Sequence, residues 1–110
     1  MNYNEADLIT CFSNDYGYER WVEKAIEFYG ESKDILILIS SSGKSLNMIN
    51  ACEAAKKKKI SKIITLTGHD KDNPLSKLGD INLWIESKAY NFIENTHQLW
   101  LLTVCDLLIG

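Results

Sequence analysis

The chain has 110 residues, of which 45% are hydrophobic and 25% are charged, and its net charge is −3. This length favours one domain with a hydrophobic core, and the composition excludes an intrinsically disordered chain. The small negative charge argues against a nucleic-acid partner. No apolar run approaches the length of a membrane span, and the polar N-terminus shows no signal peptide. We therefore expect a cytoplasmic globular protein that binds neither nucleic acid nor membrane.

Three cysteines, Cys11, Cys52 and Cys105, lie far apart and form no CxxC pair. Each stands in an apolar stretch of sequence. An odd and scattered set of this kind predicts buried free thiols in a reducing compartment.

The first third of the chain contains a short apolar run and a helical pattern. We expect a strand over residues 7–12 and a polar loop over residues 13–17. Residues 18–29 are predicted to form a helix, because apolar side chains recur there at helical spacing and Gly30 follows.

The rest of the chain alternates between strand and helix patterns. Strands are expected over residues 34–39, 62–67 and 80–85, helices over 44–59 and 89–109, and a short helical turn over 74–78. This alternation predicts βαβ units with right-handed crossovers, and so an α/β fold with four parallel strands. Ligands of such sheets bind beyond the carboxyl ends of the strands.

The most informative motif follows the apolar strand 34–39 and opens the next helix. It consists of Ser40, Ser41, Ser42, Gly43, Lys44 and Ser45. Free N–H groups and the helix dipole at such a position attract an anion, and serine hydroxyls add donors. Gly43 allows a close approach of the backbone or a positive φ. The motif therefore predicts a phosphate site.

The motif has two other interpretations. Ser42 or Ser45 could be a simple N-cap of the helix. Gly43-Lys44-Ser45 also looks like the end of a Walker A loop, but Leu38 stands where that motif needs a glycine. A nucleotide site of that class is therefore not expected.

The last predicted helix is apolar around most of its circumference. A helix that covers one face of a globular domain needs only a stripe of apolar residues. We therefore expect residues 89–109 to contact another subunit.

Four segments together resemble the sugar isomerase (SIS) domain, and within it the phosphoheptose isomerase branch. They are residues 34–45, residues 63–68, residues 13–18 and the pair Glu94 and His97. The resemblance implies a three-layer α/β sandwich with a parallel sheet, flavodoxin-like in architecture. It also implies a homotetramer or dimer, and a sugar phosphate such as sedoheptulose 7-phosphate as substrate in heptose biosynthesis.

The resemblance also implies roles for individual residues. Ser40, Ser41, Ser42 and Ser45, with Gly43 in the same loop, would bind the phosphate. Asn14 and Asp15 would contact the sugar chain. Glu94 stands where the isomerases usually have a glutamine that contacts substrate and zinc, and His97 matches a histidine often found three residues later. Asp15 and Glu94 are thus the candidate catalytic residues, and Glu94 with His97 the weak candidate for a zinc site.

Simpler roles remain open for the same residues. Asp15 could form an Asx-turn or cap the helix that follows. Glu94 and His97 lie three residues apart on one helix face and could be an interface pair. Leu102 stands where the isomerases have a histidine that binds metal and moves a proton, which leucine cannot do.

The family's opening helices, first strand and first phosphate loop have no counterpart in this chain. The chain is expected to be a fragment or to pair with another chain. A non-catalytic SIS domain that senses a sugar phosphate, or acts as a scaffold, is the alternative function.

Overall fold

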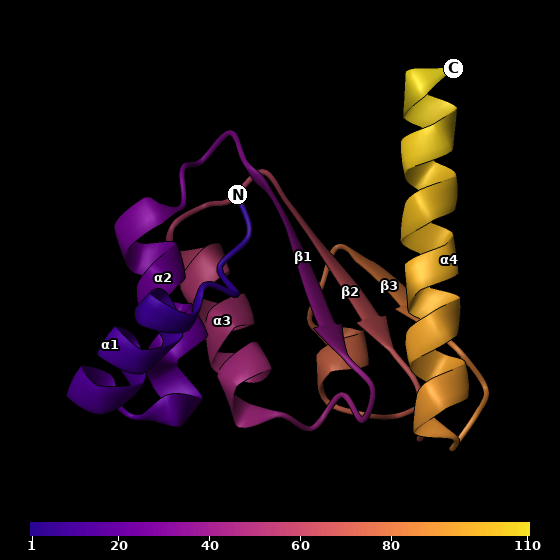
Figure 1. Cartoon of the computed structure of the whole chain (residues 1–110), viewed down its shortest axis with the longest axis horizontal. Coiled ribbons are helices and arrows are strands. Elements are labelled where there is room, and N and C mark those ends of the chain that lie inside the picture. Colours follow the sequence, from indigo (N-terminus) through magenta and orange to yellow (C-terminus); the bar gives the residue numbers. More distant parts are fainter.

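The computed structural model describes all of residues 1–110 as an α/β fold (Figure 1). Its helices and strands follow in chain order: α1 (Ala6–Tyr16), the 3-10 turn η1 (Tyr18–Arg20), α2 (Trp21–Tyr29), β1 (Ile35–Ser40), α3 (Leu46–Lys57), β2 (Lys62–Thr67), the 3-10 turn η2 (Leu75–Lys77), β3 (Ile81–Trp84) and α4 (Tyr90–Ile109). None of these helices has the length and hydropathy that a membrane crossing would require.

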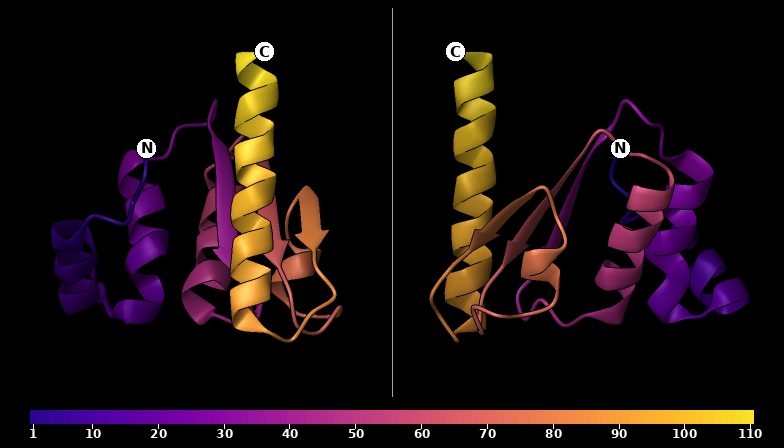
Figure 2. Two further views of the ribbon diagram at one scale, coloured as in Figure 1. Left: turned by 45° about the vertical axis from the view of Figure 1, so that its right-hand side comes forward. Right: turned by 180° about the vertical axis from the view of Figure 1, so that it is seen from behind.

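The sheet has three strands in the order β1-β2-β3, and both pairs are parallel. Ser40 at the end of β1 lies opposite Thr67 at the end of β2. Helices α2 and α3 cover one face of the sheet and α4 lies against the other, with α1 packed outside α2 (Figures 1 and 2). The carboxyl ends of β1 and β2 therefore meet at one edge, next to the beginning of α3.

The core lies between the sheet and the α2–α3 layer. Helices α2 and α3 approach each other closely because small side chains are buried between them, among them Ala25, Ala51 and Ala55. Leu38 and Ile63 contribute from the strands, and Trp21 and Ile26 from α2. The buried residues of α2 and α3 thus face the sheet, whereas Ile35, Ile37 and Ile39 of β1 are exposed.

The prediction of a strand over residues 7–12 is wrong, because these residues belong to helix α1. Phe12 is buried and Leu8 and Ile9 pack against the core, a spacing that repeats with the period of a helix. A run of only two consecutive apolar residues does not distinguish strand from helix. The sheet consequently has three strands instead of the predicted four.

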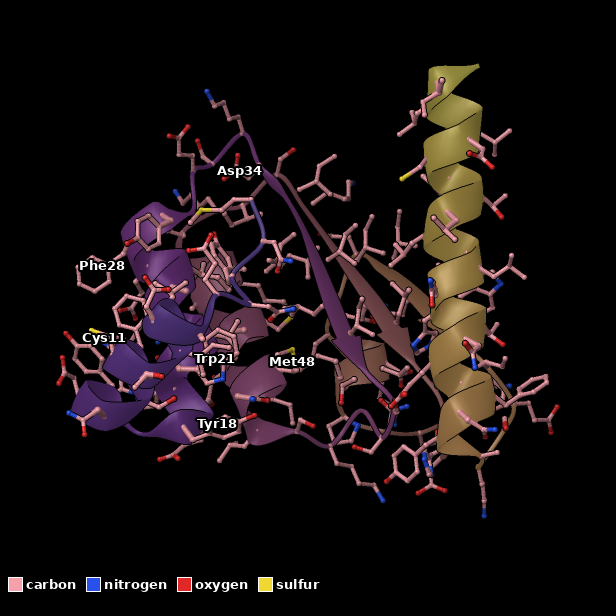
Figure 3. All side chains as sticks on the ribbon, in the orientation of Figure 1. Cys11, Tyr18, Trp21, Phe28, Asp34 and Met48 are labelled. Atoms are coloured by element: carbon pink, nitrogen blue, oxygen red, sulfur yellow. The ribbon has the colours of Figure 1, made fainter.

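The other predicted elements are all present, with bounds shifted by one or two residues in most cases. The prediction for the cysteines is correct for Cys52 alone, which is buried, so that desolvation raises the pKa of its thiol. Cys11 is exposed on the outer side of α1 (Figure 3), and Cys105 is exposed on the part of α4 that projects beyond the sheet (Figure 1). All three are free thiols.

Candidate phosphate site

The serine motif forms a tight turn between β1 and α3. The N–H of Gly43 donates to both the carbonyl and the Oγ of Ser40, each at 3.1 Å. Ser40 Oγ in turn donates to Ser45 Oγ at 3.2 Å, and the N–H of Lys44 donates to Ser42 Oγ at 3.2 Å. The hydroxyls thus lie around one short turn of backbone at the carboxyl edge of the sheet.

The N-terminus of α3 retains unpaired donors. Ser45 occupies the N-cap position, but no side chain makes a capping hydrogen bond there. The N–H groups of Ser42, Ser45 and Leu46 donate no hydrogen bond within the chain. An N-terminal helix turn without a cap leaves its donors for water or for a ligand. The structure therefore does not support a serine that simply caps this helix.

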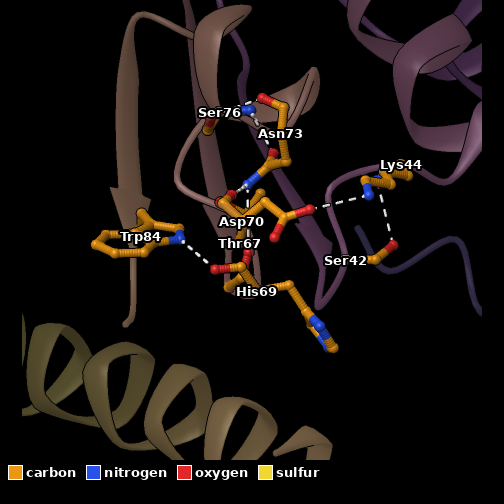
Figure 4. A network of polar contacts seen from close by, with 9 residues as sticks. Ser42, Lys44, Thr67, His69, Asp70, Asn73, Ser76 and Trp84 are labelled. Atoms are coloured by element: carbon orange, nitrogen blue, oxygen red, sulfur yellow. Dashed lines mark hydrogen bonds and ion pairs between the residues drawn. The ribbon is translucent and has the colours of Figure 1, made fainter. Parts of the chain in front are cut away.

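The turn is fixed from outside by a buried asparagine. Gly43 has φ +66°, and a Cβ at this position would collide with the Asn73 side chain. Asn73 Nδ2 donates to Thr67 Oγ1, Gly68 O and Asp70 O, and its Oδ1 accepts the N–H of Ser76 (Figure 4). Asn73 therefore connects the end of β2 and the following loop to the serine turn.

An ion pair also links this loop to the turn. Lys44 Nζ lies 3.0 Å from Asp70 Oδ2 (Figure 4), and this hydrogen bond and the positive charge of Lys44 lower the pKa of the Asp70 carboxyl. Both side chains are more than half exposed. The sequence analysis did not predict a role for Asp70 or Asn73 in the site. Their position could have indicated one, because they lie in a polar loop directly after β2, at the edge where ligands of parallel sheets bind.

His69 precedes Asp70, and its side chain is half-buried. Its ring packs against Tyr90 of α4, with 4.6 Å between ring centroids, and its φ is +53°. Trp84 Nε1 donates to the carbonyl of His69 at 3.3 Å (Figure 4). The contact with α4 buries the ring and could not be inferred from the polar neighbours in sequence.

Asn14 and Asp15 lie in the last turn of α1 instead of in the expected loop. Both are exposed, and neither makes a hydrogen bond or ion pair with the serine turn. The only polar contact of Asp15 within the chain is with the thiol of Cys11, at 3.9 Å. Helix α1 lies outside α2, away from the sheet (Figure 1). The fold therefore does not join these residues to the phosphate turn within this chain.

Glu94 and His97 share one face of α4 but differ in environment. His97 is 2% exposed, and its Nε2 donates to the carbonyl of Thr67 at 3.0 Å. The carbonyl can only accept, so Nε2 carries the proton and Nδ1 is an unpaired acceptor. Glu94 is exposed and has no polar partner. Both line a small apolar pocket with Ile39 and Leu101.

Comparison with known proteins identifies the family. The family model described as SIS domain matches residues 1–68, which is more than half of the chain. The chain belongs to the SIS domain family.

Phosphoheptose isomerases are the relatives found by sequence. The SIS chain is 36% identical over 104 residues to the phosphoheptose isomerase of Sulfurimonas denitrificans. The aligned residues cover 94% of the chain and 52% of the relative. It is 43% identical over 80 residues to that of Histophilus somni, covering 73% of the chain and 40% of the relative. The chain thus spans about half the length of the curated relatives it matches.

Solved structures of the same enzymes have the same fold as this SIS chain. The phosphoheptose isomerase of Francisella tularensis matches with a TM-score of 0.85 and 31% identity, over 94% of the chain and 55% of that structure. Phosphoheptose isomerase GmhA of Neisseria gonorrhoeae matches with a TM-score of 0.83 and 29% identity, over 94% and 58%. The parallel sheet and its helices are therefore those of an SIS domain.

The zinc site that the family resemblance implies does not fit the donors of this SIS chain. A protein zinc site needs at least three side-chain ligands, and no group of three or more His, Cys, Asp or Glu residues is placed to hold a metal. His97 could offer only Nδ1 to a metal, because its Nε2 is bonded to the carbonyl of Thr67. These 110 residues by themselves therefore do not supply the ligands of a zinc site.

Proposed function

We propose that this chain is a sugar-phosphate-binding SIS domain whose serine turn holds the phosphate of a heptose phosphate such as sedoheptulose 7-phosphate. The observation that carries the proposal is the uncapped N-terminus of α3, where unpaired N–H groups of Ser42, Ser45 and Leu46 stand beside serine hydroxyls. Resemblance to phosphoheptose isomerases supports the choice of a heptose phosphate.

The turn would bind phosphate through neutral donors and one helix dipole. Twelve residues of α3 align their peptide dipoles, so that the positive end lies at Leu46. The hydroxyl of Ser42 accepts a hydrogen bond from the N–H of Lys44, and that of Ser45 accepts one from Ser40 Oγ. Their own protons, like that of Ser41, would therefore be free to donate to phosphate oxygens. Lys44 forms an ion pair with Asp70 and would add positive charge at the rim of the site.

The isomerase reaction itself would need more than this turn. Moving a proton between adjacent carbons requires a base, an acid and a group that polarises the carbonyl. Asp15 and Glu94 remain our candidates for contacts to the sugar chain, and both are exposed and without strong polar partners. We propose that they act only when the part of the SIS fold outside these residues completes the site.

A non-catalytic sugar-phosphate sensor or scaffold is the second candidate. Two features favour it: Leu102 stands where the resemblance implies a proton-carrying histidine, and the fold brings no group of three or more possible zinc ligands together within this chain. Both candidates share the phosphate turn and differ only in chemistry at the sugar.

We also propose that the protein is a cytoplasmic homo-oligomer, a dimer or tetramer. Along α4, a series of large apolar side chains is exposed: Phe92, Leu99, Leu102, Val104, Leu107, Leu108 and Ile109. An apolar surface of this extent on a helix end that projects beyond the sheet (Figure 1) is typical of a subunit contact.

Calorimetry with serine variants tests the phosphate site. A hydrogen bond to a charged group contributes roughly 1.5–3 kcal/mol, so Ser42→Ala or Ser45→Ala is expected to raise the Kd for sedoheptulose 7-phosphate about ten- to hundredfold. Ser32→Ala, at an exposed serine before β1, is the control and should leave the Kd unchanged. Equal affinities for all four proteins would contradict the proposed site.

A further inference from the structure

Two side chains of α4 are buried, Ile93 and His97. The half of the helix that carries them lies beside the carboxyl ends of the strands (Figures 1 and 2). The imidazole of His97 makes one hydrogen bond, and its Nδ1 has no partner. A buried polar atom without a partner costs free energy, which an apolar side chain of similar size would avoid. Packing alone therefore does not account for a histidine at this position.

The hydrogen bond of His97 falls on the peptide group that joins Thr67, the last residue of β2, to Gly68. His97 Nε2 donates to the Thr67 carbonyl at 3.0 Å, and the N–H of Ile85 donates to the same oxygen at 3.1 Å. At the other end of this peptide group, the N–H of Gly68 donates to the carbonyl of Ser41 at 2.9 Å. The group is trans and therefore planar, and its C=O and N–H point in opposite directions. Holding the oxygen thus also sets the direction of the N–H that binds the serine turn.

Ser41 begins a second peptide group in the same series. Its carbonyl accepts the hydrogen bond from Gly68, and the N–H at the other end of that group belongs to Ser42 and has no partner within the chain. Two peptide groups in series thus connect His97 to a free donor of the phosphate turn. Hydrogen bonds in such a series polarise one another, so acceptor bonds at one end strengthen the donor at the other.

Burial and packing protect this series from water. Thr67 and Asn73 are both buried, and Asn73 Nδ2 donates to Thr67 Oγ1 at 3.1 Å. Ile93 packs so closely on Gly68 that a Cβ at this glycine would lie 2.6 Å from its Cδ1. The peptide group after Thr67 is therefore enclosed by α4 on one side and by the Asn73 loop on the other.

We propose that His97 is a positioning residue of the phosphate site, which orients and polarises the N–H of Ser42 through the two peptide groups. This role rests on the proposed function of the serine turn and differs from that of the zinc ligand that the resemblance implies. Without the Nε2 donor, the Thr67 carbonyl keeps only its bond to Ile85, and the peptide group after Thr67 can rotate more freely. The N–H of Ser42 is then a weaker and less well directed donor to a phosphate oxygen.

A matched pair of variants tests the donor. In His97→Gln, the amide Nε2 stands as many bonds from the backbone as the imidazole Nε2 and can donate to Thr67, whereas His97→Met has no donor. We expect the Kd for sedoheptulose 7-phosphate, measured by calorimetry, to rise about three- to tenfold in His97→Met, the range for one neutral hydrogen bond. His97→Gln should restore the wild-type Kd. Ile63→Val, at a buried position of the same strand, is the control that weakens packing without removing a hydrogen bond, and should leave the Kd unchanged.

NMR of the ligand-free chain separates this proposal from the proposed function. Nitrogen-15 spectra of the imidazole should show the proton of His97 on Nε2 in the wild type, a test that needs no variant to fold. The scalar coupling across the hydrogen bond from Gly68 to Ser41 should weaken in His97→Met and return in His97→Gln. A proton on Nδ1, or a Kd and a coupling that are the same in all three proteins, would overturn the positioning role even if the chain binds the sugar phosphate. A coupling that responds as expected in a chain that does not bind the sugar phosphate would support the connection from His97 to Ser42 and contradict the proposed function alone.

Discussion

Replacing Gly43 with alanine is expected to lower the free energy of unfolding by roughly 2–5 kcal/mol and to abolish sugar-phosphate binding. A left-handed conformation costs an L-residue about 1–2 kcal/mol, and overpacking a buried contact adds about 1–3 kcal/mol. Gly43 has φ +66°, and its Cβ would collide with Asn73. Chemical denaturation gives the stability, and calorimetry with sedoheptulose 7-phosphate gives the binding.

Gly110 provides the control for this variant. It also has a positive φ, of +93°, but no atom lies within 4 Å of a Cβ built there. Gly110 is also the last of the 110 residues, so its backbone can leave this conformation without moving a neighbour, and Gly110→Ala is expected to change neither stability nor binding measurably. Wild-type stability in Gly43→Ala would show that the serine turn does not need the conformation that Gly43 adopts.

Replacing Asn73 with aspartate is expected to cost about 3–5 kcal/mol, the range for a buried charge without a partner. The substitution keeps the shape of the side chain but removes the Nδ2 donor, and so turns an oxygen toward the acceptors Thr67 Oγ1, Gly68 O and Asp70 O. The serine turn should lose its support, because Asn73 packs directly against Gly43. Urea denaturation measures the loss.

Asn95→Asp is the control with the same change of charge. Asn95 is exposed on α4 and makes one hydrogen bond, to the carbonyl of Asn91. Its replacement should change the free energy of unfolding by no more than about 0.5 kcal/mol, as is usual for surface substitutions. If Asn73→Asp were no more destabilising than Asn95→Asp, the network around Asn73 would not hold the loop.

The phosphate turn could be predicted from the sequence because its causes are local. A continuous apolar strand, four serines and a glycine before a helical pattern place donors at one edge of a parallel sheet. Strand β2 has the bounds that its β-branched residues predicted. These features depend on the order of residues in a short segment, which the sequence displays directly.

The features that the sequence did not reveal depend on distant contacts. The close packing of Asn73 against Gly43 joins two loops thirty residues apart, and no local sequence pattern indicates this contact. The ring of His69 is half-buried because α4 brings Tyr90 against it. The prediction of a strand over residues 7–12 was wrong because packing of Phe12 against the core determines which face of α1 is buried. Tertiary contacts outweigh short apolar patterns in such cases.

An NMR titration tests the central claim most directly. Isotope-labelled chain is titrated with sedoheptulose 7-phosphate, and with sedoheptulose as the control that lacks the phosphate. We predict saturable amide shifts at Ser40 to Leu46 with the phosphate ester, because the unpaired N–H groups of this turn would contact the phosphate oxygens. Amides of this turn that do not move at millimolar sugar phosphate, or that move equally with sedoheptulose, would contradict a phosphate site at the N-terminus of α3.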